Sequence, residues 1–128
     1  MEPNGDSSAS APGSWRHPTD DEQRLFARLL SREFRGRGEV AEQLESAQVR
    51  ISNYDGCLEI KPHDEAPSAP GIQRVPVEAQ GTDVDGAPIH ALLHVPDGRA
   101  KKLEFIKWDG TSIEKLPAAD AWEIRVAE

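Results

Sequence analysis

The sequence predicts an α+β domain: two N-terminal helices packed on one face of a five- or six-stranded antiparallel sheet, formed by a hairpin and a meander. Two observations predict it. Apolar residues recur at helical spacing over 19–47, and from Val49 onward they alternate with polar residues, as in half-buried strands. In the C-terminal half an Asp-Gly pair recurs at 85–86, 97–98 and 109–110, which is typical of turns between strands. Helices followed by a run of strands favour a two-layer domain.

The first helix is expected over 19–32. Thr19 and Glu22 follow Pro18 in the order of a capping box, in which each side chain bonds to the other's backbone amide. A second helix is expected over about 38–47, after Gly36 and Gly38 break the first pattern. The apolar residues that place these helices on the core are Leu25, Phe26, Leu29 and Leu30 in the first and Val40, Leu44 and Ala47 in the second.

A hairpin is expected next, with a four-residue loop over 53–56. That length pairs Val49 with Ile60 and Ile51 with Leu58, so all four face one side. The proline-containing stretch 62–74 follows as a long connection, and it leaves open on which edge of the later strands the hairpin lies.

Residues 75–113 are expected to form an antiparallel meander. A type I turn with a glycine bulge at each Asp-Gly pair gives three cross-strand pairs: Ala79 with Ala91, Ala91 with Leu103, and Phe105 with Ile113. A last strand over about 122–126 is expected at an edge. The predicted core face of the meander comprises Val75, Val77, Ala79, Ile89, Ala91, Leu93, Leu103, Phe105 and Ile113.

Composition bounds the class of protein. The chain has 128 residues, 37% of them apolar, and a net charge of −8, which disfavours binding to nucleic acid or anionic membranes. A single domain over 18–128 is expected, with 1–17 as a disordered Ser-, Ala- and Pro-rich leader whose Trp15 is expected to dock back on the domain. The single cysteine, Cys57, excludes an internal disulfide. With no apolar signal segment, the cytoplasm is the expected location.

The face of the meander opposite the core is the candidate binding surface. The expected register sets Gln80, His90 and Glu104 in one row and Glu78, Leu92 and Lys102 in the next. Leu92, Ile106 and Trp108 would form an exposed apolar strip within a polar rim, as partner surfaces often do. The alternative is that the segment from Leu116 to Trp122 folds over this strip and covers it.

Catalytic and metal chemistry find little support in the residues. His90 beside Glu104 has the form of a general base with an orienting carboxylate, but such a pair on a sheet is also an ordinary cross-strand contact, and no matching nucleophile is evident. His90 and His94 are four residues apart, which on a strand is about 13 Å and too far for one metal ion. No cofactor-binding or catalytic motif is present, so neither a metal nor a cofactor is expected.

Four arginines form a secondary candidate. On the expected first helix they share one stripe, which suits an anionic or acidic partner. The alternative is a solvated face whose guanidinium groups pair with nearby glutamates. These arginines are Arg24, Arg28, Arg32 and Arg35.

Several segments resemble a family of small uncharacterised bacterial proteins of the actinobacterial type. The resemblance spans about 16–125, and its motifs are a helix cap, core positions and hairpin turns. It implies the α+β fold and attaches no function. The chain departs from the family pattern at 35–37, where a Phe-Pro-Gly-like sequence is expected. The segments that carry the resemblance are 16–22, 29–30, 43–49, 75–79, 85–89 and 103–110.

The function expected from these observations is that of a non-enzymatic protein-binding module that acts through the exposed sheet face. In its most concrete form this is an immunity-type or antitoxin-type protein that covers a basic surface of its partner. Two alternatives remain at this point. One is a small-ligand binder or enzyme that uses His90 and Glu104, and the other is an accessory subunit that dimerises through the same face.

Overall fold

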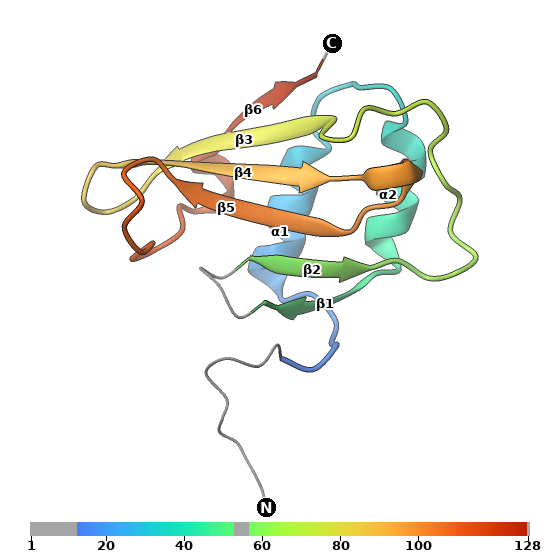
Figure 1. The fold of residues 1–128 in the computed structure, drawn as a ribbon, viewed down its shortest axis with the longest axis horizontal. Coiled ribbons are helices and arrows are strands. Elements are labelled where there is room, and N and C mark those ends of the chain that lie inside the picture. The colour runs from blue at the N-terminus through green and yellow to red at the C-terminus, as the bar shows by residue number, and fades with distance from the viewer. Residues whose placement is uncertain (1–12, 53–56, 128) are drawn as a thin grey trace, which may run out of the picture.

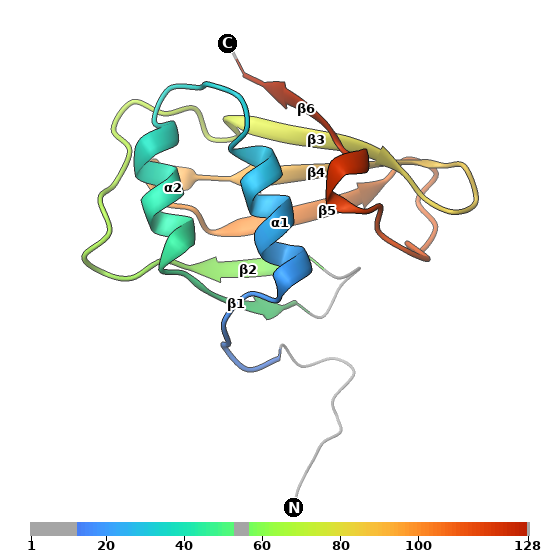
Figure 2. The same ribbon diagram turned by 180° about the vertical axis from the view of Figure 1, so that it is seen from behind.

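The computed structural model describes residues 13–52 and 57–127. The strands form one six-stranded sheet in the order β1-β2-β5-β4-β3-β6, and every neighbouring pair is antiparallel. Both helices cover the same face of this sheet (Figures 1 and 2), which confirms the predicted fold. The elements are α1 (Asp20–Leu29), α2 (Arg37–Glu45), β1 (Gln48–Ile51), β2 (Leu58–Lys61), β3 (Val77–Thr82), β4 (Pro88–His94), β5 (Lys102–Lys107), β6 (Glu123–Val126) and two 3-10 turns, η2 (Pro96–Gly98) and η3 (Ala119–Ala121).

Helix α1 begins with the predicted capping box. The Glu22 amide donates to Thr19 Oγ1 at 3.2 Å, and the Thr19 amide donates to Glu22 Oε1 at 2.8 Å. The helix ends at Leu29 rather than at the predicted residue 32. Both the Ser31 amide, at 3.1 Å, and Ser31 Oγ, at 2.6 Å, donate to the Arg28 carbonyl, so a tight turn with a side-chain bond replaces the next helical hydrogen bond.

Helix α2 spans Arg37–Glu45, whereas the sequence predicted 38–47. It therefore starts one residue earlier and ends two residues earlier than expected. Its N-cap, Gly36, has a φ of 85°, a left-handed conformation that favours glycine. A Cβ atom there would also lie 2.8 Å from Ile72 Cδ1 of the connection that packs behind the helix. Glycine at this position therefore lets the 62–74 connection approach the junction between the two helices.

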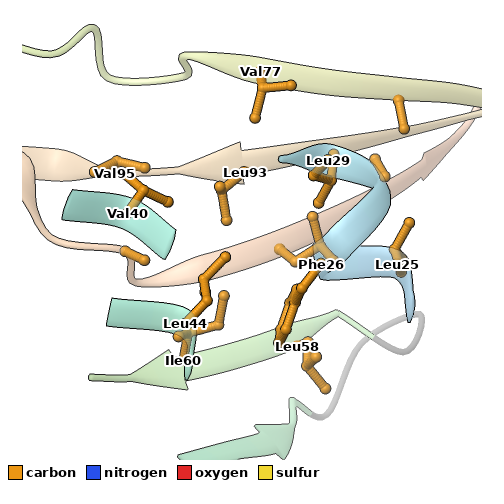
Figure 3. Packing of buried hydrophobic residues seen from close by; sticks show 14 of the residues in the cluster. Leu25, Phe26, Leu29, Val40, Leu44, Leu58, Ile60, Val77, Leu93 and Val95 are labelled. Atoms are coloured by element: carbon orange, nitrogen blue, oxygen red, sulfur yellow. The ribbon is translucent and has the colours of Figure 1, made fainter. Parts of the chain in front are cut away.

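The core lies between the helices and one face of the sheet (Figure 3). Alternate residues of every strand point into it, while their neighbours face away. Three predicted core positions, Leu30, Val75 and Ile113, are only half-buried. The buried apolar residues of the sheet include Val49, Leu58, Ile60, Val77, Ala79, Ile89, Ala91, Leu93, Leu103, Phe105 and Ile124.

Three predicted pairings are confirmed. Strand β1 pairs with β2 in the expected register, Val49 with Ile60, although the loop 53–56 that joins them lies outside the described residues. Strand β3 pairs with β4 so that Ala79 is opposite Ala91. The last strand, β6, lies at an edge beside β3, and the hairpin that the sequence left unplaced joins the sheet at β5.

The predicted register between β4 and β5 is wrong by two residues, because Ala91 is opposite Phe105 and not Leu103. The loop is longer than a hairpin turn because its backbone bonds to other segments. Gln43 Nε2 of α2 donates to the Gly98 carbonyl at 2.8 Å, and the Ala100 amide donates to Gln43 Oε1 at 2.7 Å. A shift of two preserves the faces, so the predicted core residues of both strands remain inside.

The predicted pairing of Phe105 with Ile113 is also wrong. The turn at Asp109-Gly110 forms, but no strand follows it among residues 108–118. The amides of Glu114 and Lys115 donate instead to the carboxylate of Asp83, at 2.8 and 3.0 Å. This bonding draws the segment away from β5 and across the helix-covered face of the sheet.

Asp83 and Lys107 form a buried ion pair at the same place. Lys107 Nζ lies 3.0 Å from Asp83 Oδ2 and 2.6 Å from Asp85 Oδ2. Burial opposes ionisation of Asp83, but hydrogen bonds from the Glu114 amide, Lys107 and the Val84 and Lys115 amides outweigh it and hold the pKa of that carboxyl well below its usual range. The hydrogen bond to Asp85 raises the pKa of Lys107. Burial lowers this pKa, but the second bond, to Asp83, raises it again, and the net shift is upward.

Replacing Gln43 by Leu tests the polar bridge between α2 and the 95–101 loop. The Gln43 side chain is fully buried and also donates to the Pro67 carbonyl at 2.7 Å, so the substitution leaves several buried backbone groups without partners. We expect the free energy of unfolding to fall by about 2–4 kcal/mol in urea denaturation. Gln48→Leu, at an exposed position of β1, is the control and is expected to change little. Equal losses of stability for the two substitutions would contradict the role of Gln43 as the polar bridge between α2 and this loop.

The Asp83 carboxyl predicts an acid-sensitive fold. Its pKa is lowered on folding, so its contribution is fully present above the ordinary aspartate pKa of about 3.9 and is lost as the pH falls through and below that value. Between pH 5 and pH 2 the urea midpoint should therefore fall more steeply in the wild type than in Asp83→Asn. The difference in slope corresponds to about one extra proton that the wild type takes up on unfolding. Asp64→Asn, in an exposed loop, should keep the wild-type slope. A parallel profile for Asp83→Asn would refute the role of this pair.

Candidate functional site

The face of the sheet that points away from α1 and α2, hereafter the open face, carries the predicted apolar strip. No helix lies over it among the described residues, as Figure 1 shows with the sheet in front of both helices. Trp108 is 75% exposed and Ile106 is 42% exposed on this face, and Leu92 is half-buried beside them. The His90 ring lies against the strip, with its centroid 6.4 Å from that of Trp108. The geometry thus brings together the four predicted residues at its centre.

The rows of polar residues differ from those predicted, as a consequence of the shifted β4–β5 register. Gln80 is opposite His90 as expected, but His90 is opposite Ile106 rather than Glu104. Glu104 is opposite Leu92, in a row with Glu78. The predicted His90–Glu104 pair is therefore wrong, and so is the place of Lys102 in the second row, whereas Glu78 is opposite Leu92 as predicted.

Glu104 instead bonds to a histidine that the sequence reasoning did not select. His94 Nε2 and Glu104 Oε1 are 2.8 Å apart, on a diagonal between β4 and β5. In the observed register His94 is opposite Lys102 and Leu92 is opposite Glu104, so His94 and Glu104 are diagonal neighbours. The predicted register does not bring them together. The contact directs the Glu104 side chain toward β4 and away from β2.

The alternative that the C-terminal segment covers the strip is wrong. Pro117 and Trp122 pack on the helix-covered side of Gly81, where a Cβ atom would lie 2.7 Å from Pro117 Cγ and 3.0 Å from Trp122 Cε3. The Trp122 ring is buried and lies with its centroid 6.2 Å from that of Phe105, a core residue. The segment therefore runs on the opposite side of the sheet from Trp108.

The β1 edge of the sheet is occupied by the chain itself. The Arg16 amide donates to the Val49 carbonyl at 2.9 Å, and the Val49 amide donates back to Arg16 at 2.8 Å. Trp15 docks as expected, with its ring centroid 4.4 Å from Arg50 Cζ and 4.8 Å from Lys61 Nζ. Residues 13–17 of the predicted leader are thus placed along β1, and residues 1–12 lie outside the described part.

Arg16 also ties this segment to α1. Its guanidinium meets the Glu22 carboxylate through two bonds, at 2.7 and 2.9 Å. Burial opposes ionisation of Glu22, but the bonds from Arg16 and Thr19 lower the pKa of its carboxyl below its ordinary value. The capping residue of the helix thereby anchors the segment that closes the sheet edge.

The outer edge of β6 is closed by two members of the arginine stripe. Arg28 Nε donates to the Trp122 carbonyl at 3.0 Å, and Arg32 donates to the Ile124 carbonyl at 3.2 Å. The Ala127 amide bonds to Pro76 beside β3, so the alternate carbonyls at 122 and 124 point outward. Two guanidinium groups occupying these carbonyls leave β6 a poor template for a further strand.

The other two arginines of the stripe behave differently. Arg24 pairs with Asp21 at 2.9 Å on the exposed side of α1, and Arg35 lies against Gly71 of the connection. The stripe therefore does not present four free guanidinium groups, and within residues 13–52 and 57–127 none of the four makes the pair with a glutamate that the alternative expected.

The β3–β6 flank of the open face carries charged side chains of both signs, because Arg125 lies opposite Glu78 and beside Glu123. The half-buried Glu78 side chain makes no hydrogen bond or ion pair within residues 13–52 and 57–127, and Glu123 has only a 3.9 Å approach to Arg125. Farther away, over β1 and β2, Arg50 is paired with Glu59 at 2.9 Å. The apolar centre and the mixed charges of the β3–β6 flank together suit a protein partner with an apolar patch and charged groups around it.

The fold and this face define a small two-layer α+β domain in which one face of the sheet is covered by no element of residues 13–52 and 57–127. It belongs to the family of a domain of unknown function, DUF6984, whose model matches residues 15–117. That match agrees with the resemblance to an uncharacterised family. Comparisons with curated proteins and with solved structures find no match. In the described part of the chain, neither helix has the length and apolar character needed to cross a membrane.

The exposed Trp108 and the buried Trp122 should differ sharply in their contribution to the free energy of unfolding. Trp108→Ala removes a ring that is 75% exposed, so we expect the free energy of unfolding to change by no more than about 0.5 kcal/mol. Trp122→Ala removes a buried ring and should cost about 3–5 kcal/mol. Urea denaturation followed by circular dichroism measures both. A large loss for Trp108→Ala would mean that its ring is part of the core.

Proposed function

We propose that the protein is a non-enzymatic protein-binding module whose partner docks on the open face. The observation that carries this proposal is the exposure of Trp108 and Ile106 at the centre of a sheet face that no described element covers. Tryptophan is enriched at binding hot spots, and exposed apolar strips within polar rims are typical of partner surfaces. Docking would remove the strip from water.

The closed sheet edges support the face rather than an edge as the docking surface. A partner that added a strand would need free backbone groups along β1 or β6. The segment 13–16 occupies those of β1, and Arg28 and Arg32 occupy outward carbonyls at β6. The partner therefore contacts side chains of the open face rather than extending the sheet.

The charge of the whole chain favours a basic partner. The chain carries a net charge of −8, and Glu78 and Glu123 of the open face, with Arg125 near both, are available to cations of that partner. In its concrete form the module is an immunity-type or antitoxin-type protein of the bacterial cytoplasm that covers a basic surface of a toxin. Long-range attraction between opposite charges would then speed association, and added salt would slow it.

Of the two alternatives, the enzyme depends on His90 lying beside Glu104, and the observed register separates them. The accessory subunit that dimerises through the same face uses the same strip, with a second copy in place of a basic protein. Sedimentation velocity at micromolar concentration distinguishes it, because a monomer argues against the dimer.

Affinity capture with matched variants tests the proposal. Tagged wild type, Trp108→Ala and Leu116→Ala are incubated with lysate of the cells that make the protein, and bound proteins are identified by mass spectrometry. Leu116 is 40% exposed but belongs to the helix-covered side, so its variant is the control. We expect one stoichiometric basic protein to be captured by the wild type and Leu116→Ala and lost with Trp108→Ala.

The charge of the interface is tested with the captured partner. Binding should weaken as salt rises, and Glu78→Gln combined with Glu123→Gln should weaken it further, whereas Glu39→Gln combined with Glu42→Gln on α2 should not. Capture that survives Trp108→Ala in a folded protein would overturn the open face as the binding surface.

A further inference from the structure

A groove on the helix-covered side of the sheet, hereafter the helix-side groove, is separate from the open face. It lies between the first turns of α1 and the segment 115–122 and has a volume of about 980 Å³. Its floor is formed by core residues of the sheet and the C-terminal segment: Leu58, Leu103, Phe105 and Trp122. That size lies at the upper end of the range for small-molecule sites, which are mostly apolar.

The rim of the groove holds an unusual share of the exposed apolar side chains. Of the five large hydrophobic residues that are exposed in the described part, three lie here and only two on the open face. Val84 is 66% exposed, Ile51 is 43% exposed and Leu116 is 40% exposed. These side chains surround an apolar floor that is already closed to water, so an apolar ligand would gain mainly by burying the exposed rim.

The charged side chains of the rim do not favour an ionic ligand. Arg24 is paired with Asp21 at 2.9 Å, and Glu22 is paired with Arg16 at 2.7 Å. Lys115 and Asp120, both exposed, carry opposite charges. The rim therefore offers no excess of either sign, and an uncharged molecule avoids the cost of desolvating a charge.

One polar group of the floor lacks a partner. Trp122 is 1% exposed, and its indole N–H donates no hydrogen bond within residues 13–52 and 57–127. Buried indole donors usually find an acceptor, and a buried donor without one is costly. A ligand with a carbonyl oxygen would supply the missing acceptor.

We propose that the helix-side groove binds an uncharged, apolar small molecule that carries a hydrogen-bond acceptor, such as a ketone or ester carbonyl, and that the Trp122 indole N–H donates to it. The ligand lies between Phe105 and the apolar rim. This site is independent of the open face, because the two lie on opposite sides of the sheet. A partner protein and a small molecule would not compete for the same residues.

Titration with Nile red, an uncharged apolar dye that carries a carbonyl group, tests the site. Its fluorescence should rise saturably with the wild type. Val84→Glu combined with Leu116→Glu should weaken binding at least about tenfold, because a rim carboxylate must be desolvated when the dye enters. Ile106→Glu and Trp108→Ala alter the open face instead and should leave the binding of Nile red unchanged. Circular dichroism verifies that each variant is folded.

Indole N–H signals in ¹⁵N-resolved spectra locate the dye. Trp15→Phe and Trp108→Phe each remove one signal, which assigns the third to Trp122 without disturbing the core. Addition of Nile red should shift the Trp122 proton downfield and leave that of Trp108 in place. Absence of saturable binding, or loss of binding in the open-face variants alone, would overturn the groove as a site. Groove-dependent binding with an unmoved Trp122 signal would overturn the proposed hydrogen bond.

Discussion

The buried ion pair between Asp83 and Lys107 decides how the C-terminal third of the chain is arranged. Asp83 ends the β3 side of a hairpin and accepts bonds from Lys107 Nζ, from its neighbour Val84 and from the amides of Glu114 and Lys115. A carboxylate in that position is stable only when its acceptor sites are filled, since an unpaired buried charge is expensive. The pair thus holds residues 114–115 against the end of the β3–β4 hairpin, on the helix-covered side.

That attachment determines what the rest of the segment does. From residues 114–115 the chain delivers Pro117 and Trp122 to the core side of Gly81 and then enters β6 as the edge strand beside β3. Arg28 and Arg32 of α1 bind the outward carbonyls at that edge. The same routing keeps this segment off the open face, which no other described element covers, and creates the wall of the helix-side groove. Both candidate binding surfaces are consequences of one polar cluster that stabilises the loop.

Local patterns predicted the elements, and contacts between distant segments determined where prediction failed. The Thr19 capping box, the Val49–Ile60 pairing and the Ala79–Ala91 pairing depend on neighbours in sequence, and all three are confirmed. The β4–β5 register failed because Gln43, more than fifty residues away in the chain, bonds to the loop. An apolar period cannot reveal such a bond. A register error of two preserves the faces, which explains why the core residues of β4 and β5 were predicted correctly while the His90–Glu104 row was not.

The central claim is that the open face meets a basic protein partner in the cell. A photo-reactive amino acid placed at Ile106 tests it most directly, with the same group at Glu42 on the exposed side of α2 as the reference. Illumination of intact cells should give one crosslinked adduct from Ile106, of a basic protein other than the chain itself, and no such adduct from Glu42. An adduct with a second copy of the chain, or none from Ile106 in a folded protein, would contradict the claim.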